Sequence, residues 1–436
     1  MHAMNRRSSL PRLCSAVFSA LLALLLVSFE AAAERIQLDI ASSGVRKLAV
    51  AVPPFTDSSG SSASAVGKDI ARLVTTGLEF HGFIQTVGPQ RGGSGSSADW
   101  RRGGADYVVT GKYTISGGRM TVEGRLLDTT ADKLLPARQF RGDVSQQDDL
   151  ALRLVDALVE DFTGEPGVSR TSIAFISDSS GSKEVYLADV LGRKVRQVTK
   201  HNHLCVSPRF TPDGGSLAYS SYHRGNQNLY ITDLSQDRTT RAISRREGMN
   251  LAPAFSPDGK TMIVTLSRDG SPDLYRMDVR GEVLERLTEQ AGINVSPSFS
   301  PDGRQIAFVS DRSGKPQIYV MDLASKKSRL LTLQGKENVE PSWSPKGDKI
   351  AYTSLTAGRY HIFTIPTDGG APVRVTSGYG DYESPTWSPD GRQIAFSRKR
   401  NGQMELCVIH ANGTGERTLF RLKGNQSYPR WSPRRN

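Results

Sequence analysis

A short phrase, Ser or Thr followed by Pro and in most copies by Asp-Gly, recurs through the second half of the chain. Its prolines are spaced 45, 44, 44, 44 and 44 residues apart, at Pro212, Pro257, Pro301, Pro345, Pro389 and Pro433. A sustained period of this length indicates one supersecondary unit that is copied and stacked. The repeat therefore constrains the fold before any single residue is considered.

Each copy of the phrase predicts a strand, a tight turn and a second strand, because Pro presets the first turn dihedral while Asp and Gly tolerate positive φ. The second strand is a short apolar run such as Ile306-Ala307-Phe308, and a third such as Ile318-Tyr319-Val320 follows it. A basic, half-polar fourth strand such as 285–288 ends the unit, as expected for a soluble outer edge. Four strands in a unit of this length predict a β-propeller blade.

The two ends of the repeat do not match. A second strand occurs once more upstream, at 173–176, with no Pro-Asp-Gly before it, whereas the last phrase, 428–433, has no second strand after it. First and second strands pair throughout only if the C-terminal strand completes the blade that begins near Thr171. We therefore expect a six-bladed β-propeller over residues 171–436, closed by the C-terminal strand.

The N-terminus has the features of a secretory signal peptide. Three arginines precede an apolar core from about Ala16 to Phe29, and Ala31-Ala32-Ala33 supplies a small-residue cleavage site before Glu34. The apolar core is short for a membrane span. Residues 1–33 are therefore expected to direct export.

The segment between the signal peptide and the repeat predicts a small mixed α/β domain. Strand, helix and hairpin patterns follow one another, and Gly and Pro residues then end the last helix before the repeat begins. The expected parts are a domain at 34–165 with a mobile N-terminal segment at 34–45, a strand at 47–52, helices at about 63–80 and 145–162, a hairpin at 107–127, and a hinge at 166–170.

Charge and cysteine content limit the possible partners. The formal net charge is +12, and removing residues 1–33 takes away three Arg and one Glu and leaves about +10. Because the chain is expected to be exported, we expect no nucleic-acid partner. A solvated basic surface explains the charge, with an anionic partner such as peptidoglycan or lipid headgroups as the alternative.

Cys205 and Cys407 remain after export, on different strand types, and are not expected to form a disulfide.

The sequence offers little catalytic chemistry. It has no Gly-x-Ser-x-Gly elbow. His201, His203 and Cys205 alternate and could place three metal ligands on one face, but equivalent positions in other blades carry Asn, Tyr or Gln, which are poor zinc ligands. We expect no metal, no cofactor and no enzymatic activity. The alternative is a propeller hydrolase or lyase with its active site at the channel mouth, and the acidic cluster for it is Glu337, Glu340, Asp381 and Glu383.

The first residues of the inner strands are expected to surround one opening of the central channel. Asn recurs there in three neighbouring blades, and two interpretations stand side by side. The amides satisfy inner-strand backbone groups, or the opening is a rigid cup for a protein or peptide. On the second interpretation the partner-binding residues are Met249, Asn250, Ala252, Asn294, Val295, Asn338 and Tyr382.

The order of parts resembles a known family. A secretory signal, a small α/β domain, the junction 162–175 (FTGEPGVSRTSIAF) and six such blades together resemble the TolB family, the periplasmic propeller proteins of the Tol-Pal system, over the whole mature chain. The resemblance implies a periplasmic, monomeric binding protein without enzymatic activity, peripheral to the envelope membranes through its protein partners. It implies a role in outer-membrane invagination during cell division and in outer-membrane integrity.

The resemblance also implies two partners. The peptidoglycan-associated lipoprotein Pal would bind at the channel mouth of the propeller. TolA would bind the mature N-terminal segment, Glu34 to about Val45, once that segment is released from its own domain. One residue departs from the family pattern, because Met249 stands where a His is expected. The residues expected to engage TolA are Glu34, Arg35, Ile36, Gln37, Leu38 and Asp39.

Overall fold

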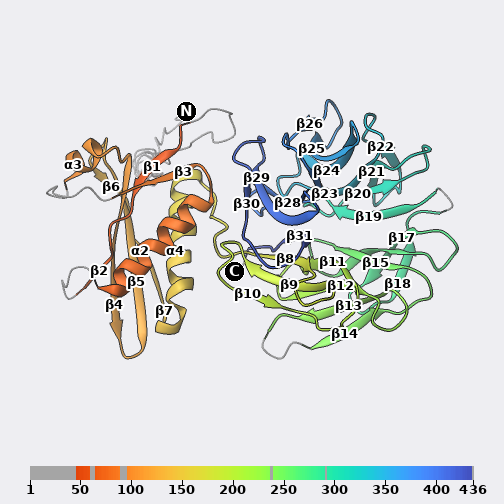
Figure 1. The fold of residues 1–436 in the computed structure, drawn as a ribbon, viewed down its shortest axis with the longest axis horizontal. Coiled ribbons are helices and arrows are strands. Elements are labelled where there is room, and N and C mark those ends of the chain that lie inside the picture. Colours follow the sequence, from red (N-terminus) through yellow and green to blue (C-terminus); the bar gives the residue numbers. More distant parts are fainter. Residues whose placement is uncertain (1–45, 59–63, 89–95, 236–238, 290–291, 435–436) are drawn as a thin grey trace, which may run out of the picture.

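The computed structural model describes residues 46–434, apart from 59–63, 89–95, 236–238 and 290–291 and the side chain of Ala252. It consists of an α/β part and a ring of six sheets, arranged side by side (Figure 1). The predicted signal peptide and the N-terminal segment 34–45 lie outside the described residues. The predicted fold class, a small α/β domain followed by a six-bladed propeller, is confirmed.

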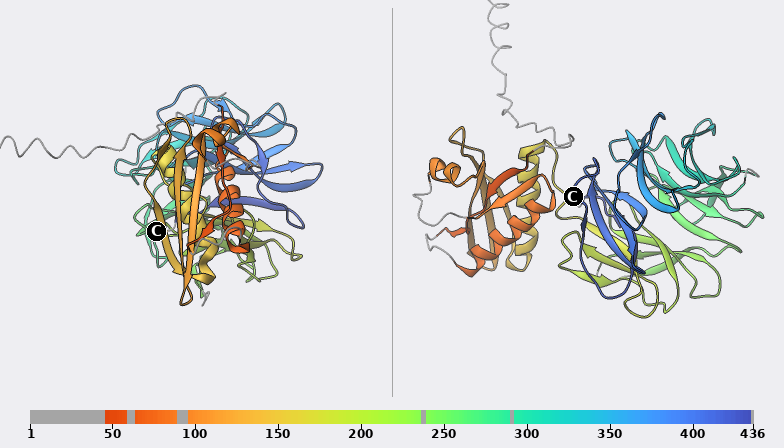
Figure 2. Two further views of the ribbon diagram at one scale, coloured as in Figure 1. Left: turned by 90° about the vertical axis from the view of Figure 1, so that its left-hand side faces the viewer. Right: turned by 45° about the horizontal axis from the view of Figure 1, so that its top comes forward.

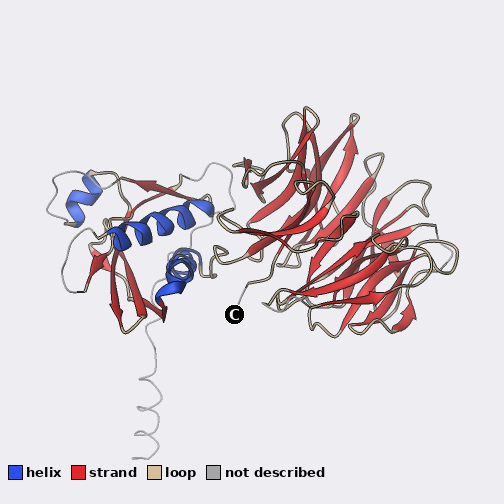
Figure 3. Ribbon diagram, turned by 60° about the horizontal axis from the view of Figure 1, so that its bottom comes forward, coloured by secondary structure: helices blue, strands red, loops and turns tan. Residues whose placement is uncertain are grey.

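The α/β part is one mixed sheet with the two long helices, α2 and α4, on one face (Figure 3). The sheet order is β3-β1-β4-β5-β6, with β2 beside β4 and β7 beside β5. Helices α2 and α4 pack their apolar faces on the sheet, around buried Val74 and Leu158. The elements are β1 (Leu48–Ala51), β2 (Thr56–Asp57), α2 (Ala65–Phe80), β3 (Ile84–Val87), α3 (Ser97–Arg102), β4 (Tyr107–Ser116), β5 (Arg119–Asp128), β6 (Lys133–Leu134), β7 (Arg138–Asp143), η1 (Val144–Gln146) and α4 (Gln147–Thr163).

Local chemistry sets the ends of the two long helices. The Ser64 hydroxyl accepts a hydrogen bond from the Gly67 N–H at 3.0 Å, which caps α2. Helix α4 ends at Gly164, whose φ of 77° is left-handed and suits glycine. None of the helices in the described part of the chain has the length and apolar character of a membrane span.

The propeller is built from six four-stranded antiparallel sheets. Five blades run inner to outer in chain order, as the repeat predicts. They are β11 (Cys205–Phe210), β12 (Ser216–Ser221), β13 (Asn228–Asp233), β14 (Thr240–Ser244); β15 (Asn250–Phe255), β16 (Thr261–Leu266), β17 (Asp273–Asp278), β18 (Val283–Arg286); β19 (Asn294–Phe299), β20 (Gln305–Ser310), β21 (Gln317–Asp322), β22 (Ser328–Leu330); β23 (Asn338–Trp343), β24 (Lys349–Thr356), β25 (Arg359–Pro366), β26 (Val373–Arg374); and β27 (Asp381–Trp387), β28 (Gln393–Arg400), β29 (Gln403–His410), β30 (Arg417–Thr418).

The remaining blade closes the ring. It contains β8 (Ser172–Ser177), β9 (Glu184–Asp189) and β10 (Val195–Gln197), with β31 (Gln426–Trp431) as its inner strand. Strand β31 pairs antiparallel with β8, from Gln426 opposite Ser177 to Trp431 opposite Ile173. The Ser172 N–H also donates to the Ser432 hydroxyl at 3.0 Å. Closure by the C-terminal strand is therefore confirmed, and it gives the closing blade four strands like each of the other five.

The repeated phrase forms the turn between the inner strand and its neighbour. The Asp258 carboxylate, for example, accepts from the Ser256 hydroxyl at 2.6 Å and from the Lys260 N–H at 3.1 Å. The turn glycine has φ near 70° in most blades and lies against the turn proline of the preceding blade; a Cβ on Gly303 would lie 3.3 Å from Pro257. The phrase thus shapes each turn and also lets neighbouring turns pack closely.

Every inner strand is interrupted by a β-bulge before its internal proline. Register shifts occur in all six inner strands, and the residue before that proline has a left-handed φ of 54° at Ser207, 56° at Ser296 and 54° at Glu340. This conformation is uncommon for residues other than glycine. The bulge therefore divides each inner strand into a first half and a turn half that can direct their side chains differently.

The α/β part packs against the first and last blades (Figures 1 and 2). The Phe80 ring at the end of α2 lies 6.2 Å from the Trp431 ring, and the Arg417 guanidinium lies 5.3 Å from the Phe80 ring centroid. His81 is buried, and its Nε2 accepts from the Val168 N–H at 3.1 Å. The predicted hinge at 166–170 is thus bonded to the helices it follows; its movement as a hinge stays a prediction.

Candidate functional site

The central channel of the propeller has two chemically different ends. We call the end at the first residues of the inner strands the channel mouth, and the end at the Ser-Pro turns the turn end. An inner strand of six residues such as β15 separates them by about 17 Å, because a strand rises about 3.3 Å per residue. The residues predicted for partner binding lie at the channel mouth, and a cavity lies at the turn end.

The three asparagines at the channel mouth are fully buried within their blades. The Asn250 amide donates to the carbonyl oxygens of Gln227, Arg246 and Gly248 at 2.9, 2.7 and 3.1 Å. The Asn294 amide donates to Asp273 at 2.9 Å and accepts from Arg312 at 2.8 Å. These contacts fit the structural interpretation, in which the amides fix the connection between one blade and the next.

Asn338 and Tyr382 are buried in the same way. The Asn338 amide donates to Gln317 at 2.6 Å and to the Gln334 carbonyl at 2.6 Å. The Tyr382 ring stacks on His361, with centroids 5.3 Å apart. A partner at the channel mouth would therefore meet the backbone that these side chains hold and not the side chains themselves.

Exposed apolar side chains at the channel mouth include Leu204, Met249 and Ile293. Met249 is 39% exposed and Ile293 is 47% exposed, and each directly precedes one of the buried asparagines. Val295 is partly buried and packs with Val339 against a blade core. The structure thus brings the predicted residues to one end of the channel and leaves Met249 and Ile293 as apolar contact points. Their binding role stays a prediction.

The alternating His201, His203 and Cys205 do not converge on one point. The His201 ring stacks on His223 with centroids 4.1 Å apart, while the Cys205 thiol is buried beside Thr199 and Glu184. Burial raises the pKa of Cys205 to about 12, so the thiol stays protonated at neutral pH. Within the described ranges, no group of three His, Cys, Asp or Glu side chains is arranged to hold a metal ion.

The acidic residues of the channel mouth form a cluster held by hydrogen bonds. The Glu340 carboxylate accepts from the Ser384 N–H at 2.7 Å and from the Thr353 hydroxyl at 3.0 Å. The Glu337 carboxylate accepts from Tyr360 at 3.1 Å. Burial, and then the nearby charges of Glu340 and Asp381, raise the pKa of Glu383 to about 7. Glu383 therefore exchanges its proton close to neutral pH.

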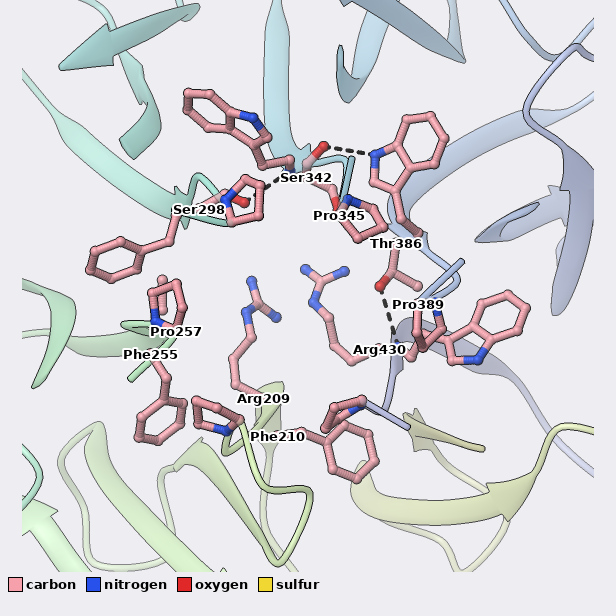
Figure 4. A pocket seen from close by; sticks show the side chains of 18 of the residues that line it. Arg209, Phe210, Phe255, Pro257, Ser298, Ser342, Pro345, Thr386, Pro389 and Arg430 are labelled. Atoms are coloured by element: carbon pink, nitrogen blue, oxygen red, sulfur yellow. Dashed lines mark hydrogen bonds between the residues drawn. The ribbon is translucent and has the colours of Figure 1, made fainter. Parts of the chain in front are cut away.

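The turn end holds a cavity of about 500 Å³ (Figure 4). Its wall is a ring of the six turn prolines and the six aromatic residues that end the inner strands, three of which are tryptophans. Its charged lining residues are three arginines, and it has no acidic lining residue. The residues are Phe210, Phe255, Phe299, Trp343, Trp387, Trp431, Pro212, Pro257, Pro301, Pro345, Pro389, Pro433, Arg209, Arg430 and Arg434.

Arg209 and Arg430 extend into the middle of this ring (Figure 4). They come from the adjacent inner strands β11 and β31. Burial, and then the charge of Arg430, lower the pKa of Arg209, while burial lowers the pKa of Arg430. The sequence interpretation missed both residues, although the repeat marks them: this position carries Ala254, Ser298, Ser342 and Thr386 in the other four blades.

Comparison with known proteins matches both parts of the chain. The model of the TolB amino-terminal domain matches residues 36–135, and the model of the TolB beta propeller domain matches residues 159–435. Together they follow the order of parts seen in the structure.

Curated relatives and a solved structure agree with these matches. The chain is 46% identical over 212 residues to the Tol-Pal system protein TolB of Desulfotalea psychrophila, covering 48% of each chain. It is 37% identical over 221 residues to the TolB homolog of Chlorobium chlorochromatii, covering 48% of this chain and 50% of that one. The chain thus spans about half the length of the curated relatives it matches. The crystal structure of TolB from Acinetobacter baumannii superposes with a TM-score of 0.79 at 27% identity, over 91% of this chain and 100% of that one.

Proposed function

We propose a protein-binding function for this chain, which belongs to the TolB family of Tol-Pal system proteins. In this proposal it acts in the periplasm without catalysis, binds the lipoprotein Pal at the channel mouth and binds TolA through residues 34–45. The observation that carries the proposal is the match of both domains, in order, to TolB models, together with the similarity of nearly the whole fold to a TolB structure. The relatives are named as components of the Tol-Pal system and not as enzymes.

The channel mouth suits a binding role on physical grounds. Buried asparagines hold the connections between blades, so the exposed Met249 and Ile293 are presented by backbone that is already fixed. A preformed apolar surface loses little conformational entropy when a partner binds. Within the mouth, the exposed apolar side chains are therefore favoured as the binding surface over the acidic cluster, whose carboxylates are engaged by Ser384, Thr353 and Tyr360.

The two binding events would be coupled through the junction between the domains. Pal at the channel mouth would change how often residues 34–45 are released for TolA, which is a coupling free energy between two sites. The contacts that could carry it are those of Phe80 with Trp431 and of His81 with Val168, since the first links α2 to the closing blade and the second links its end to the chain segment that enters that blade. The outcome would be a relay that supports outer-membrane invagination during division and the integrity of the envelope.

Pal binding at the channel mouth is tested by charge insertion. Met249→Glu places a carboxylate at an exposed apolar contact and should weaken Pal binding by about tenfold or more, because a charge would have to be desolvated in the interface. Leu330→Glu is the matched control, since Leu330 is 37% exposed against 39% for Met249 but lies on an outer strand. Isothermal titration of mature protein with soluble Pal measures both. Equal affinity in the two variants would contradict binding at the mouth.

The TolA assignment is tested by deletion. Mature protein that lacks residues 34–45 should lose TolA capture and keep Pal binding, because the two sites lie in different parts of the chain. A pull-down with each purified partner gives the result. Loss of both partners would contradict the relay, and so would undiminished TolA capture.

A further inference from the structure

One layer of the central channel differs from the symmetry of the repeat. The residue directly after the internal proline of each inner strand is small in four blades and is Arg in the two adjacent strands β11 and β31. The small side chains leave the space that the cavity occupies, and the two long cationic side chains project into it (Figure 4). The repeat fold itself does not need this arrangement, because four blades form the same strand and turn without it.

The two guanidinium groups lack a bound counter-charge. In the described part of the chain, neither Arg209 nor Arg430 has a carboxylate within ion-pair distance. The Arg209 Nη1 donates to the Pro208 carbonyl at 3.0 Å, and the Arg430 Nη1 donates to the carbonyls of Pro429 and Pro385 at 2.9 and 3.5 Å. A guanidinium has five N–H donors, so most of the donors on both residues remain for a ligand.

Nearby carboxylates do not form ion pairs with these two guanidinium groups. Glu340 acts on both arginines from a distance, but its oxygens are already bound by Ser384 and Thr353. The turn aspartates such as Asp258 and Asp302 are bound inside their own turns and do not line the cavity. Two like charges held close together away from bulk water repel each other, and an anion placed between them would relieve that cost.

The rest of the lining indicates what else the ligand carries. A volume of about 500 Å³ is typical of small-molecule sites and larger than a bare oxyanion requires. The remaining wall is mainly proline rings and aromatic side chains, which favour an apolar group. Guanidinium groups bind carboxylate and phosphate alike, through paired N–H donors.

We propose that the turn-end cavity is a ligand site in which Arg209 and Arg430 together bind the carboxylate or phosphate group of a small molecule whose apolar part lies against the proline and aromatic ring. The site is independent of the proposed partner-binding function, because it lies at the opposite end of the channel from Met249.

The test is a titration with matched probes. Benzoate and phenyl phosphate carry the anion and an apolar ring, benzamide carries the ring without charge, and inorganic phosphate carries the charge without the ring. Tryptophan fluorescence of the wild-type protein reports binding directly, since three of its four tryptophans line the cavity. We expect saturable signals from benzoate or phenyl phosphate, and at least about tenfold weaker binding of benzamide and inorganic phosphate. The stronger of the two anionic probes identifies the ligand as a carboxylate or a phosphate.

The variants Arg209→Gln and Arg430→Gln, singly and together, assign the binding residues. Each variant should weaken binding of the anionic probe by about tenfold or more. The exposed Arg280→Gln removes the same charge and should leave that binding unchanged. If benzamide binds as tightly as benzoate, or if the double variant retains wild-type affinity, the proposal is overturned. A wild-type protein that gives no saturable signal with any anionic probe overturns it as well, whether or not the variants fold.

Discussion

At the scale of single residues, the asparagines of the channel mouth have a pattern in the sequence that suggests partner binding, but their side chains stabilise the fold. Their recurrence around one opening is visible in the sequence, but their direction is not. In the structure the amide of Asn250 faces three backbone carbonyls inside the protein. A donor surrounded by acceptors cannot be exchanged for a further acceptor without loss of stability.

Asn250→Asp tests this interpretation. The new carboxylate would face the carbonyls of Gln227, Arg246 and Gly248, so we expect a loss of about 2–4 kcal/mol in the free energy of unfolding. Denaturant unfolding measures it, with the exposed Asn401→Asp as control. A cost below about 0.5 kcal/mol would mean that the amide does not hold the backbone.

Glu383 predicts a pH dependence of stability. Its pKa in the folded protein is about 7, above the ordinary value of 4.5, because of burial and then of Glu340 and Asp381, partly offset by Lys399. The folded state therefore binds more protons than the unfolded state between these two values, and stability falls as pH rises through that window.

Glu383→Gln should remove this loss. Between pH 5 and pH 8 the variant should lose about 2 kcal/mol less stability than the wild type, since an amide does not ionise. Unfolding at both pH values, with the exposed Glu282→Gln as control, gives the comparison. Parallel pH profiles for wild type and Glu383→Gln would exclude Glu383 as the source.

At the scale of elements, the end of helix α2 is tied to the chain that enters the propeller. The buried His81 ring bonds the Gly77 carbonyl at 2.9 Å through Nδ1 and accepts from Val168 through Nε2. The second bond requires an unprotonated Nε2. Burial lowers the pKa of His81 to about 4 from the ordinary 6.5, against the opposing effect of Asp390 and together with the charges of Arg392 and Arg417.

Acidification should therefore loosen this junction. The unfolded state binds more protons than the folded state between pH 6.5 and pH 4, so the free energy of unfolding decreases as the pH falls through this window. His81 accounts for a loss of about 2 kcal/mol between pH 7 and pH 5. Hydrogen exchange of residues 164–172, corrected for the intrinsic rate, should show less protection at pH 5 in the wild type than at pH 7. In His81→Gln this pH difference should shrink, and in His361→Gln, a remote buried histidine, it should persist. An unchanged pH difference in His81→Gln would rule out this mechanism.

At the scale of the whole molecule, the ring depends on strand β31. Removing residues 426–436 would leave β8 as an unpaired inner edge and would take Trp431 from its contact with Phe80. We expect a lower unfolding temperature and aggregation on gel filtration. Removing residues 435–436 alone keeps β31 and should leave both properties unchanged. A monomeric truncated protein with wild-type stability would contradict closure by this strand.

The repeat determined the number of blades, the strand order within a blade and the need for closure, because the spacing, the turn residues and the unmatched ends are all local features of the chain. The helices α2 and α4 follow from apolar residues at helical spacing. The short strands β2, β6 and β7 were not predicted, since two to six residues at sheet edges carry little pattern of their own.

The tertiary structure alone decided which residues face the channel and which face a blade. The bulge before each internal proline changes the register of the inner strand, so strict alternation cannot tell that Asn250 is buried while Arg209 extends into the cavity. Ring closure then brings Arg430, 221 positions further along the chain, beside Arg209. The architecture follows from short-range periodicity along the chain. The pairing of side chains within the channel depends on closure of the ring, which no local pattern contains.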